Sequence, residues 1–128
     1  MKRQKFSSNS PWEDKVGYSR AIRVGNIIEL SGTVAVDDCG NVVGAGKAYE
    51  QTKYIINKIL QYIEKAGGKK EHVVRTRIFV TDISQWESIG RAHGEFFKDV
   101  KPVTTMVEVK SLISKDYLVE IEATAIIF

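Results

Sequence analysis

Apolar and polar residues alternate strictly in two runs near the end of the chain, at positions 103–109 and 118–127. In an extended strand, such alternation places successive side chains on opposite faces. The first run turns its valines to one face and Thr104, Met106 and Glu108 to the other. The second run places aliphatic side chains on one face and two glutamates and a threonine on the other. Two such strands predict a sheet with one buried face and one polar face.

The same reasoning, applied to the rest of the chain, predicts a hairpin, a helix, a strand and a second helix. They occupy 17–24 with 27–36, 47–66, 73–80, and a stretch that begins near Ser84. The order is ββαβαββ, which predicts an α+β fold with two helices on one face of a single sheet. The length suits one domain, residues 1–128, in which the polar residues 1–16 predict an N-terminal arm with little structure.

Opposite the face that the helices cover, alternation gathers a polar set. Its members are Glu29, Ser31, Arg75, Arg77, Thr104, Met106, Glu108, Glu120 and Glu122, with Thr33 and Val73 in the same alternating sets. Two arginines facing several glutamates indicate a paired surface, which an oligomer can bury while its charges stay satisfied. We therefore expect self-association through this face.

Composition narrows the function classes. The net charge of +3, from 19 basic and 16 acidic side chains, lacks the dense cationic stripe of a dedicated nucleic-acid-binding protein. The one cysteine, Cys39, lies in a predicted hairpin tip and excludes an internal disulfide, which suits a reducing compartment. Because there is no signal-peptide pattern and no apolar run of about 18 residues, we expect a cytoplasmic protein that does not insert in membranes.

Several short motifs, in this order and spacing, resemble the RidA/YjgF family, also called reactive intermediate deaminases, L-PSP-type endoribonucleases or translation inhibitors. The resemblance covers residues 17–127. It is carried by Gly17-Tyr18-Ser19-Arg20-Ala21, Ser31-Gly32, Gln51-Thr52, Asn57, Phe79-Val80-Thr81-Asp82, Phe96-Phe97, Pro102, Val107-Glu108-Val109 and Val119-Glu120-Ile121-Glu122-Ala123. It implies a chorismate-mutase-like fold and a homotrimer whose sheets form a central barrel, with ligand clefts between subunits.

The resemblance also implies an activity, the hydrolysis of enamines and imines such as 2-aminoacrylate to a 2-oxo acid and ammonia, without a metal or organic cofactor. It assigns proton transfer to Glu120 and substrate orientation to Tyr18, Ser31 and Gly32. Thr104, Thr105 and Met106 line the implied cleft, as do Gly90 and His93 of the second helix.

Three positions differ from the family pattern. Thr104 stands where the family has its carboxylate-binding arginine, Met106 replaces a cysteine, and Gly90 replaces an asparagine. A threonine gives one neutral hydrogen bond, whereas an arginine gives a charge-assisted bidentate contact that is about twice as strong. We therefore expect weak turnover of 2-aminoacrylate at best, and a ligand that differs from the usual one.

Some residues allow two interpretations. Gly90 and Gly94 fit close packing of the second helix on the sheet, which we favour, or room for a ligand. His93 either lines the cleft or packs beside the phenylalanines at 96 and 97. Neither His93 nor the distant His72 fits a metal-site spacing.

Arg75 and Arg77 share an alternating set with Phe79, and one of them can supply the cation that Thr104 lacks. Pairing of both arginines with glutamates inside the barrel is the favoured alternative.

The sequence leaves three functions open. The first is an imine or enamine hydrolase, and the second is a trimeric regulatory protein that binds a small ligand without turnover. The third, an endoribonuclease or translation inhibitor, rests on family naming alone.

Overall fold

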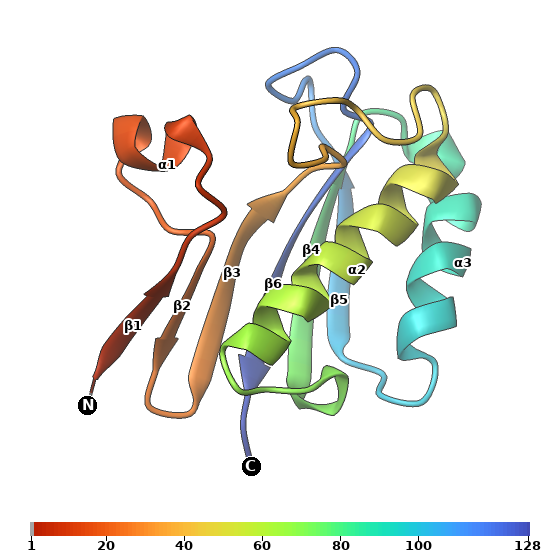
Figure 1. Cartoon of the computed structure of the whole chain (residues 1–128). Helices are drawn as coiled ribbons and strands as arrows, with labels where there is room; N and C mark the ends of the chain where they lie inside the picture. Colours follow the sequence, from red (N-terminus) through yellow and green to blue (C-terminus); the bar gives the residue numbers. More distant parts are fainter. Residues whose placement is uncertain (1) are drawn as a thin grey trace.

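A computed structural model describes residues 2–128, which form one six-stranded sheet with helices against it (Figure 1). The strands are β1 (Arg3–Phe6), β2 (Ala21–Val24), β3 (Ile27–Thr33), β4 (Val73–Val80), β5 (Val103–Glu108) and β6 (Val119–Ile126). The α-helices are α1 (Pro11–Val16), α2 (Ala48–Lys65) and α3 (Trp86–Phe97), and short 3-10 turns cover Lys70–His72 and Ile83–Gln85. None of the described helices is long and apolar enough to cross a membrane.

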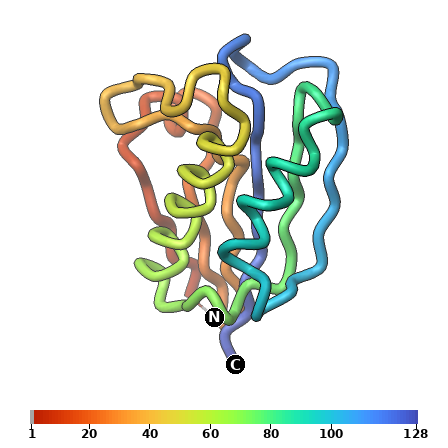
Figure 2. Tube along the Cα trace, turned by 90° about the vertical axis from the view of Figure 1, so that its right-hand side faces the viewer, coloured from red at the N-terminus to blue at the C-terminus, as the bar shows by residue number. Residues whose placement is uncertain are grey.

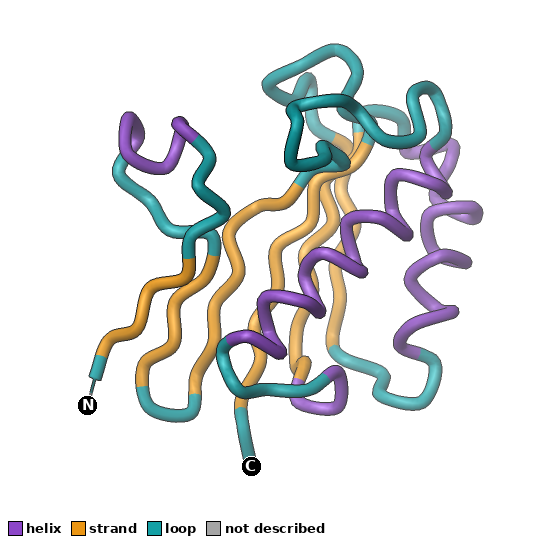
Figure 3. Tube along the Cα trace, viewed as in Figure 1, coloured by secondary structure: helices purple, strands orange, loops and turns teal. Residues whose placement is uncertain are grey.

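The strand order is β1-β2-β3-β6-β4-β5, and among these pairs only β4 and β5 run parallel. Helices α2 and α3 lie side by side on one face of the sheet (Figures 1 and 2). The opposite face, which α2 and α3 do not cover, is called the open face (Figures 2 and 3). The ββαβαββ order and the two helices on one face are thus confirmed, with β1 and α1 as additional elements before them.

The core lies between the two helices and the covered face of the sheet. Helix α2 contributes an isoleucine stripe, Ile55, Ile56, Ile59 and Ile63, because residues three and four apart share one side of a helix. The helix ends at Lys65, where Gly67 adopts the left-handed conformation that glycine takes without steric cost. Alternating residues of β6 complete the core from the sheet side.

The expectation of an unstructured N-terminal arm is wrong. Residues Arg3–Phe6 form the edge strand β1, which pairs antiparallel with β2, and Pro11–Val16 form α1. An edge strand is held by backbone hydrogen bonds, so polar side chains do not prevent it from forming. Ser10 caps α1 through a hydrogen bond from Trp12 N, and Pro11 occupies the first helical position, where it is favoured.

The prediction that Thr104, Met106 and Glu108 share the open face with Glu120 is also wrong. In the parallel register, Thr104 lies beside Thr76 and Met106 beside Ile78, both of which face the helices. The valines of β5 therefore turn to the open face, together with Thr105 beside Arg77. Because β5 is an edge strand, both of its faces are partly exposed, and its alternation does not reveal which one faces the core.

Two β-bulges change the predicted alternation. On β3, the step from Leu30 to Thr33 opposes the shorter step from Ala123 to Ile121 on β6, so one residue is extra. Thr33 consequently joins the buried face, contrary to the prediction from strict alternation. A second irregularity, at the start of β4, likewise buries Val73.

Candidate functional site

Helix α1 and the turn that follows it position Tyr18. The backbone carbonyl of Glu13 accepts hydrogen bonds from Gly17 N at 2.9 Å and from Tyr18 N at 3.0 Å. Gly17 has a φ of 89°, a left-handed conformation that reverses the chain before β2. Although burial opposes ionisation of Glu13, hydrogen bonds from Ser8 hold its pKa below the ordinary value, so this carboxylate stays charged and anchors the segment.

The bulge in β3 places Ser31 and Gly32 between Tyr18 and the end of β6. The Ser31 hydroxyl donates to Ser19 O at 2.6 Å, and Ser31 N donates to Arg20 O at 3.0 Å. Because its proton is engaged in this way, the Ser31 oxygen is left with lone pairs that can accept a hydrogen bond.

Glu120, on β6, extends across the bulge toward Gly32. A Cβ atom built on Gly32 would lie 2.5 Å from Glu120 Oε2, so only glycine leaves the carboxylate this position. Burial raises the pKa of Glu120 above that of an ordinary glutamate; nearby Arg20 opposes the rise and Glu122 adds to it. Glu120 can therefore hold a proton at a higher pH than an exposed glutamate does, a property that suits a proton donor.

Arg20 is a member of this site that alternation did not reveal. It is only 8% exposed, and its Nη2 donates to Gly32 O at 2.6 Å, which fixes the bulge beside Glu120. Its guanidinium carbon lies 5.8 Å from the centre of the Tyr18 ring. In the sequence, the position of Arg20 next to the apolar Ala21 hints that this arginine is buried. Its hydrogen-bond partner, the Gly32 carbonyl, can be identified only from the structure of the bulge.

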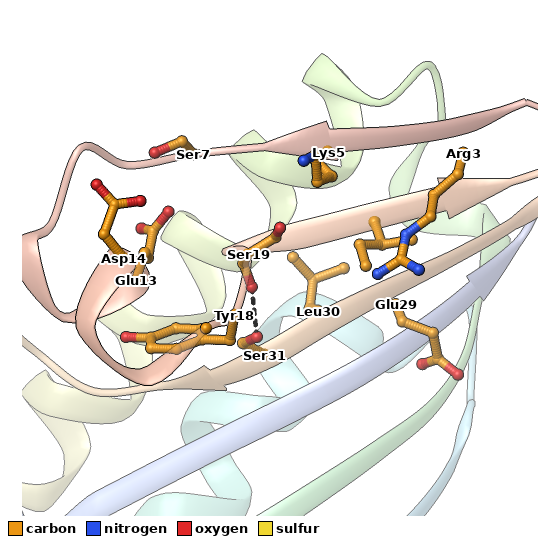
Figure 4. Close-up of a pocket in the computed structure, with 12 residues that line it drawn as sticks. Arg3, Lys5, Ser7, Glu13, Asp14, Tyr18, Ser19, Glu29, Leu30 and Ser31 are labelled. Carbon is orange, nitrogen blue, oxygen red and sulfur yellow. Dashed lines mark hydrogen bonds between the residues drawn. The ribbon is translucent and has the colours of Figure 1, made fainter.

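A cavity of about 690 Å3 opens beside this group (Figure 4). Tyr18, Ser19 and Ser31 form one part of its wall, and Arg3 and Lys5 reach into it from β1. Glu13 and Asp14 of α1 line the far end. The cavity offers hydroxyl groups and both signs of charge, which fits a small polar ligand.

Four other predicted site residues lie elsewhere, on the covered side of the sheet near β5. The Thr104 hydroxyl is hydrogen-bonded to Thr76 Oγ1 at 2.7 Å, and Thr76 Oγ1 is 2.9 Å from His93 Nε2. Met106 lies on the same side of β5 and packs against the core. Burial lowers the pKa of His93, which keeps this imidazole neutral at pH 7.

Gly90 is the fourth, and the favoured packing interpretation of the helix glycines is wrong. A Cβ atom built on Gly90 or on Gly94 would have no neighbouring atom within 4 Å, apart from the backbone of the helix itself. The glycines therefore leave open space on α3, in agreement with the alternative of room for a ligand.

Arg77 forms a salt bridge with Glu122, with 3.3 Å between Nη1 and Oε1, on the open face. The side chains are 47% and 36% exposed, so this pair contributes at most about 1 kcal/mol within one chain. Arg75 and Thr105 turn to the same face. Thr104 turns to the other face, so in one chain Arg77 does not replace the missing cation beside Thr104.

A single chain thus presents two groups of candidate residues that do not meet. Tyr18, Ser31, Gly32 and Glu120 gather at the bulge on the open side, whereas Thr104, Met106, Gly90 and His93 gather at the β5 edge on the covered side. Between them lie the strand β4 and the thickness of the sheet. Within residues 2–128, no cluster of three His, Cys, Asp or Glu side chains is arranged to hold a metal ion.

Known proteins share both the sequence and this architecture. The sequence model of the family described as Endoribonuclease L-PSP matches residues 9–127. An uncharacterized protein of Streptomyces coelicolor is 36% identical over 123 residues, which is 95% of this chain and 90% of that protein. A protein of Acinetobacter baylyi named 3-aminoacrylate deaminase RutC is 31% identical over 108 residues, covering 84% and 85% of the two chains.

The crystal structure of a Mycobacterium tuberculosis protein, described as a member of the YjgF/YER057c/UK114 family, is similar over 98% of this chain and 100% of that one. The TM-score is 0.89 and the sequence identity is 41%. These matches span nearly the whole sequence and agree with the fold and the motifs described above. The chain belongs to the RidA/YjgF family, whose sequence model is described as Endoribonuclease L-PSP.

Proposed function

We propose that the protein hydrolyses a small enamine or imine to an oxo compound and ammonia, with Glu120 as the proton-transfer residue. The observation that carries the proposal is the position of Glu120. Its Oε2 lies 2.5 Å from where a Cβ atom on Gly32 would be, burial raises its pKa, and Ser31, the residue before Gly32, lines the polar cavity. The name of a relative also supports hydrolytic deamination: the protein that matches 84% of this chain is called a 3-aminoacrylate deaminase.

The chemistry needs one group that both gives and takes a proton. Protonated Glu120 donates its proton to the enamine carbon, which turns the enamine into an iminium ion. Water then adds to the iminium carbon while the Glu120 carboxylate accepts a proton from that water. Glu120 then passes this proton to the amino nitrogen, the carbon–nitrogen bond breaks and ammonia leaves. The hydroxyl group releases its proton to Glu120 as it becomes the carbonyl of the oxo compound. Tyr18, partly exposed in the cavity wall, and Ser31 orient the substrate.

The proposed catalytic unit is a homotrimer with each site shared between two copies. The separation of the two residue groups supports this arrangement, because a second copy can bring the β5 edge, with Thr104 and His93, to the Glu120 group. The open face also carries exposed aliphatic side chains, Val24, Ile27, Val103, Val107 and Ile126, which association would remove from water.

The test is ammonia release from 2-aminoacrylate, generated in place by a dehydratase, and from 3-aminoacrylate. We expect Glu120→Gln to lower kcat at least about 100-fold, the usual contribution of a general acid or base. Glu122→Gln is the matched control, since Glu122 lies two residues away on the same face and pairs with Arg77. Equal activity of wild type and Glu120→Gln would refute the role of Glu120.

A non-catalytic role as a ligand-binding trimer is the second candidate, favoured by the neutral Thr104 in place of an arginine. Calorimetric binding of a small oxo compound, with no ammonia released from either aminoacrylate, would support this candidate over the hydrolase.

A further inference from the structure

The hydroxyl of Thr104 does not stand alone at the β5 edge. It is joined to Thr76 Oγ1 at 2.7 Å, and Thr76 in turn is joined to His93 Nε2 at 2.9 Å. Thr76 is only 1% exposed, whereas Thr104 is exposed on the edge strand. The three side chains thus connect a half-buried imidazole to a hydroxyl at the surface through one buried hydroxyl.

Each hydroxyl has a single proton, so the chain of hydrogen bonds has only two polarities. If His93 Nε2 carries a proton, it donates to Thr76, Thr76 donates to Thr104, and the proton of Thr104 points outward as a donor. If Nε2 carries none, Thr104 donates to Thr76 and Thr76 donates to Nε2. Thr104 then presents only lone pairs to a ligand. The protonation of His93 therefore decides what Thr104 can offer.

Neutral imidazole has two tautomers and allows both polarities, whereas imidazolium carries protons on both nitrogens and allows only the first. We propose that Thr76 and His93 are positioning residues that set the polarity of Thr104, so that the site accepts the N–H of an uncharged amide only while His93 is neutral, and holds a carboxylate oxygen most strongly when His93 is charged. The ligand part of this inference rests on the proposed function; the polarity part does not.

The surroundings of His93 leave it free to act in this way. Burial is the cause of its lowered pKa, and the Phe97 ring centre lies 4.8 Å from its own. The charged and titratable groups on the packed elements turn elsewhere. Where α3 faces α2, the Tyr49 hydroxyl donates to Glu95, and the Tyr49 ring lies under Arg91. On β4, Arg75 and Arg77 turn to the open face. On β5, the Glu108 carboxylate accepts a hydrogen bond from Ile83 N.

The first test needs no ligand. Nitrogen-15 NMR of the full chain reports the tautomer and the titration of His93. Thr76→Val removes the central hydroxyl at nearly constant volume, and we expect the His93 titration to move to lower pH because imidazolium loses its acceptor. Thr124→Val is the matched control, since this threonine of β6 turns to the opposite face, where its hydroxyl donates to Glu29. A His93 titration that is identical in wild type and Thr76→Val would overturn the inference.

The second test compares pyruvate with pyruvamide by calorimetry at two pH values, one above and one below the His93 titration that the NMR experiment measures. We expect pyruvamide to bind more tightly at the higher pH, and pyruvate to gain about tenfold at the lower pH, the factor for roughly one charge-assisted hydrogen bond. Thr76→Val should abolish that gain, and Thr124→Val should keep it.

A pyruvate affinity that does not change with pH, or a gain that survives in Thr76→Val, would overturn the ligand part. Failure of the proposed function would be seen differently, as equal ammonia release by wild type and Glu120→Gln. In that case the NMR titration of His93 still tests the polarity part of the inference.

Discussion

At the scale of single residues, the candidate site depends on what surrounds Glu120. Glycine at position 32 leaves room for its carboxyl group, and Arg20 holds the bulge in place through the Gly32 carbonyl. A glutamate in this environment is protonated more readily than one in water. The bulge in β3, with its one extra residue, determines the surroundings of the Glu120 carboxyl group. The proposed chemistry therefore depends on the bulge as well as on the glutamate.

The raised pKa of Glu120 predicts how stability depends on pH. The folded protein holds this proton to a higher pH than the unfolded chain does. The contribution of Glu120 to stability is therefore complete below the ordinary glutamate pKa and is lost as pH rises through the raised value. We expect Glu120→Gln, which cannot ionise, to have the same melting temperature as wild type near pH 4 and a higher melting temperature near pH 7.

Thermal melts across that pH range, with Glu122→Gln as the exposed control, measure the difference. A Glu120→Gln protein that melts below wild type at pH 7 would mean that the ionised carboxylate is stabilised in the fold, against the effect of burial.

At the scale of elements, the sequence predicts most of the sheet and both long helices correctly, because their faces differ strongly in polarity. The isoleucine stripe of α2 and the alternation in β6 each match the buried side. The prediction fails at β1, where polar residues form a strand through their backbones, and at β5, whose two faces differ too little.

The site is less predictable than the fold, because alternation is local and the site depends on register. Tyr18, Ser31, Gly32 and Glu120 do gather, as the resemblance implies. Thr104 was assigned to the wrong face because only its parallel pairing with Thr76 determines where it points. Arg20 is part of a motif in the sequence but was given no role in the site, because its partner carbonyl, Gly32 O, lies twelve residues away.

Helix α3 gives a prediction at the same scale. Gly90 and Gly94 have open space where a side chain would start, and glycine inside a helix costs about 1 kcal/mol relative to alanine. We expect Gly94→Ala and Gly90→Ala each to stabilise the fold by about that amount in denaturant melts. If Gly90 leaves room for a ligand, only Gly90→Ala should also weaken pyruvamide binding. Loss of stability in both variants would contradict the open space.

At the scale of the whole molecule, the candidate residues form two half-sites on different faces. The first contains Glu120, the proposed proton-transfer residue, and lies beside the cavity that Tyr18 and Ser31 line; the second, around Thr104, carries the hydrogen-bonded chain to His93. The proposed trimer would bury the exposed aliphatic side chains of the open face, where Arg77 and Glu122 are already paired within one chain.

The most direct test is a crystal structure of the assembled protein soaked with pyruvamide. We expect a trimer with the ligand bound between two copies, within hydrogen-bond distance of Glu120 of one copy and Thr104 of the next. A monomer would contradict it, as would a ligand held by Arg3 and Lys5 in the cavity of one chain with Glu120 out of reach.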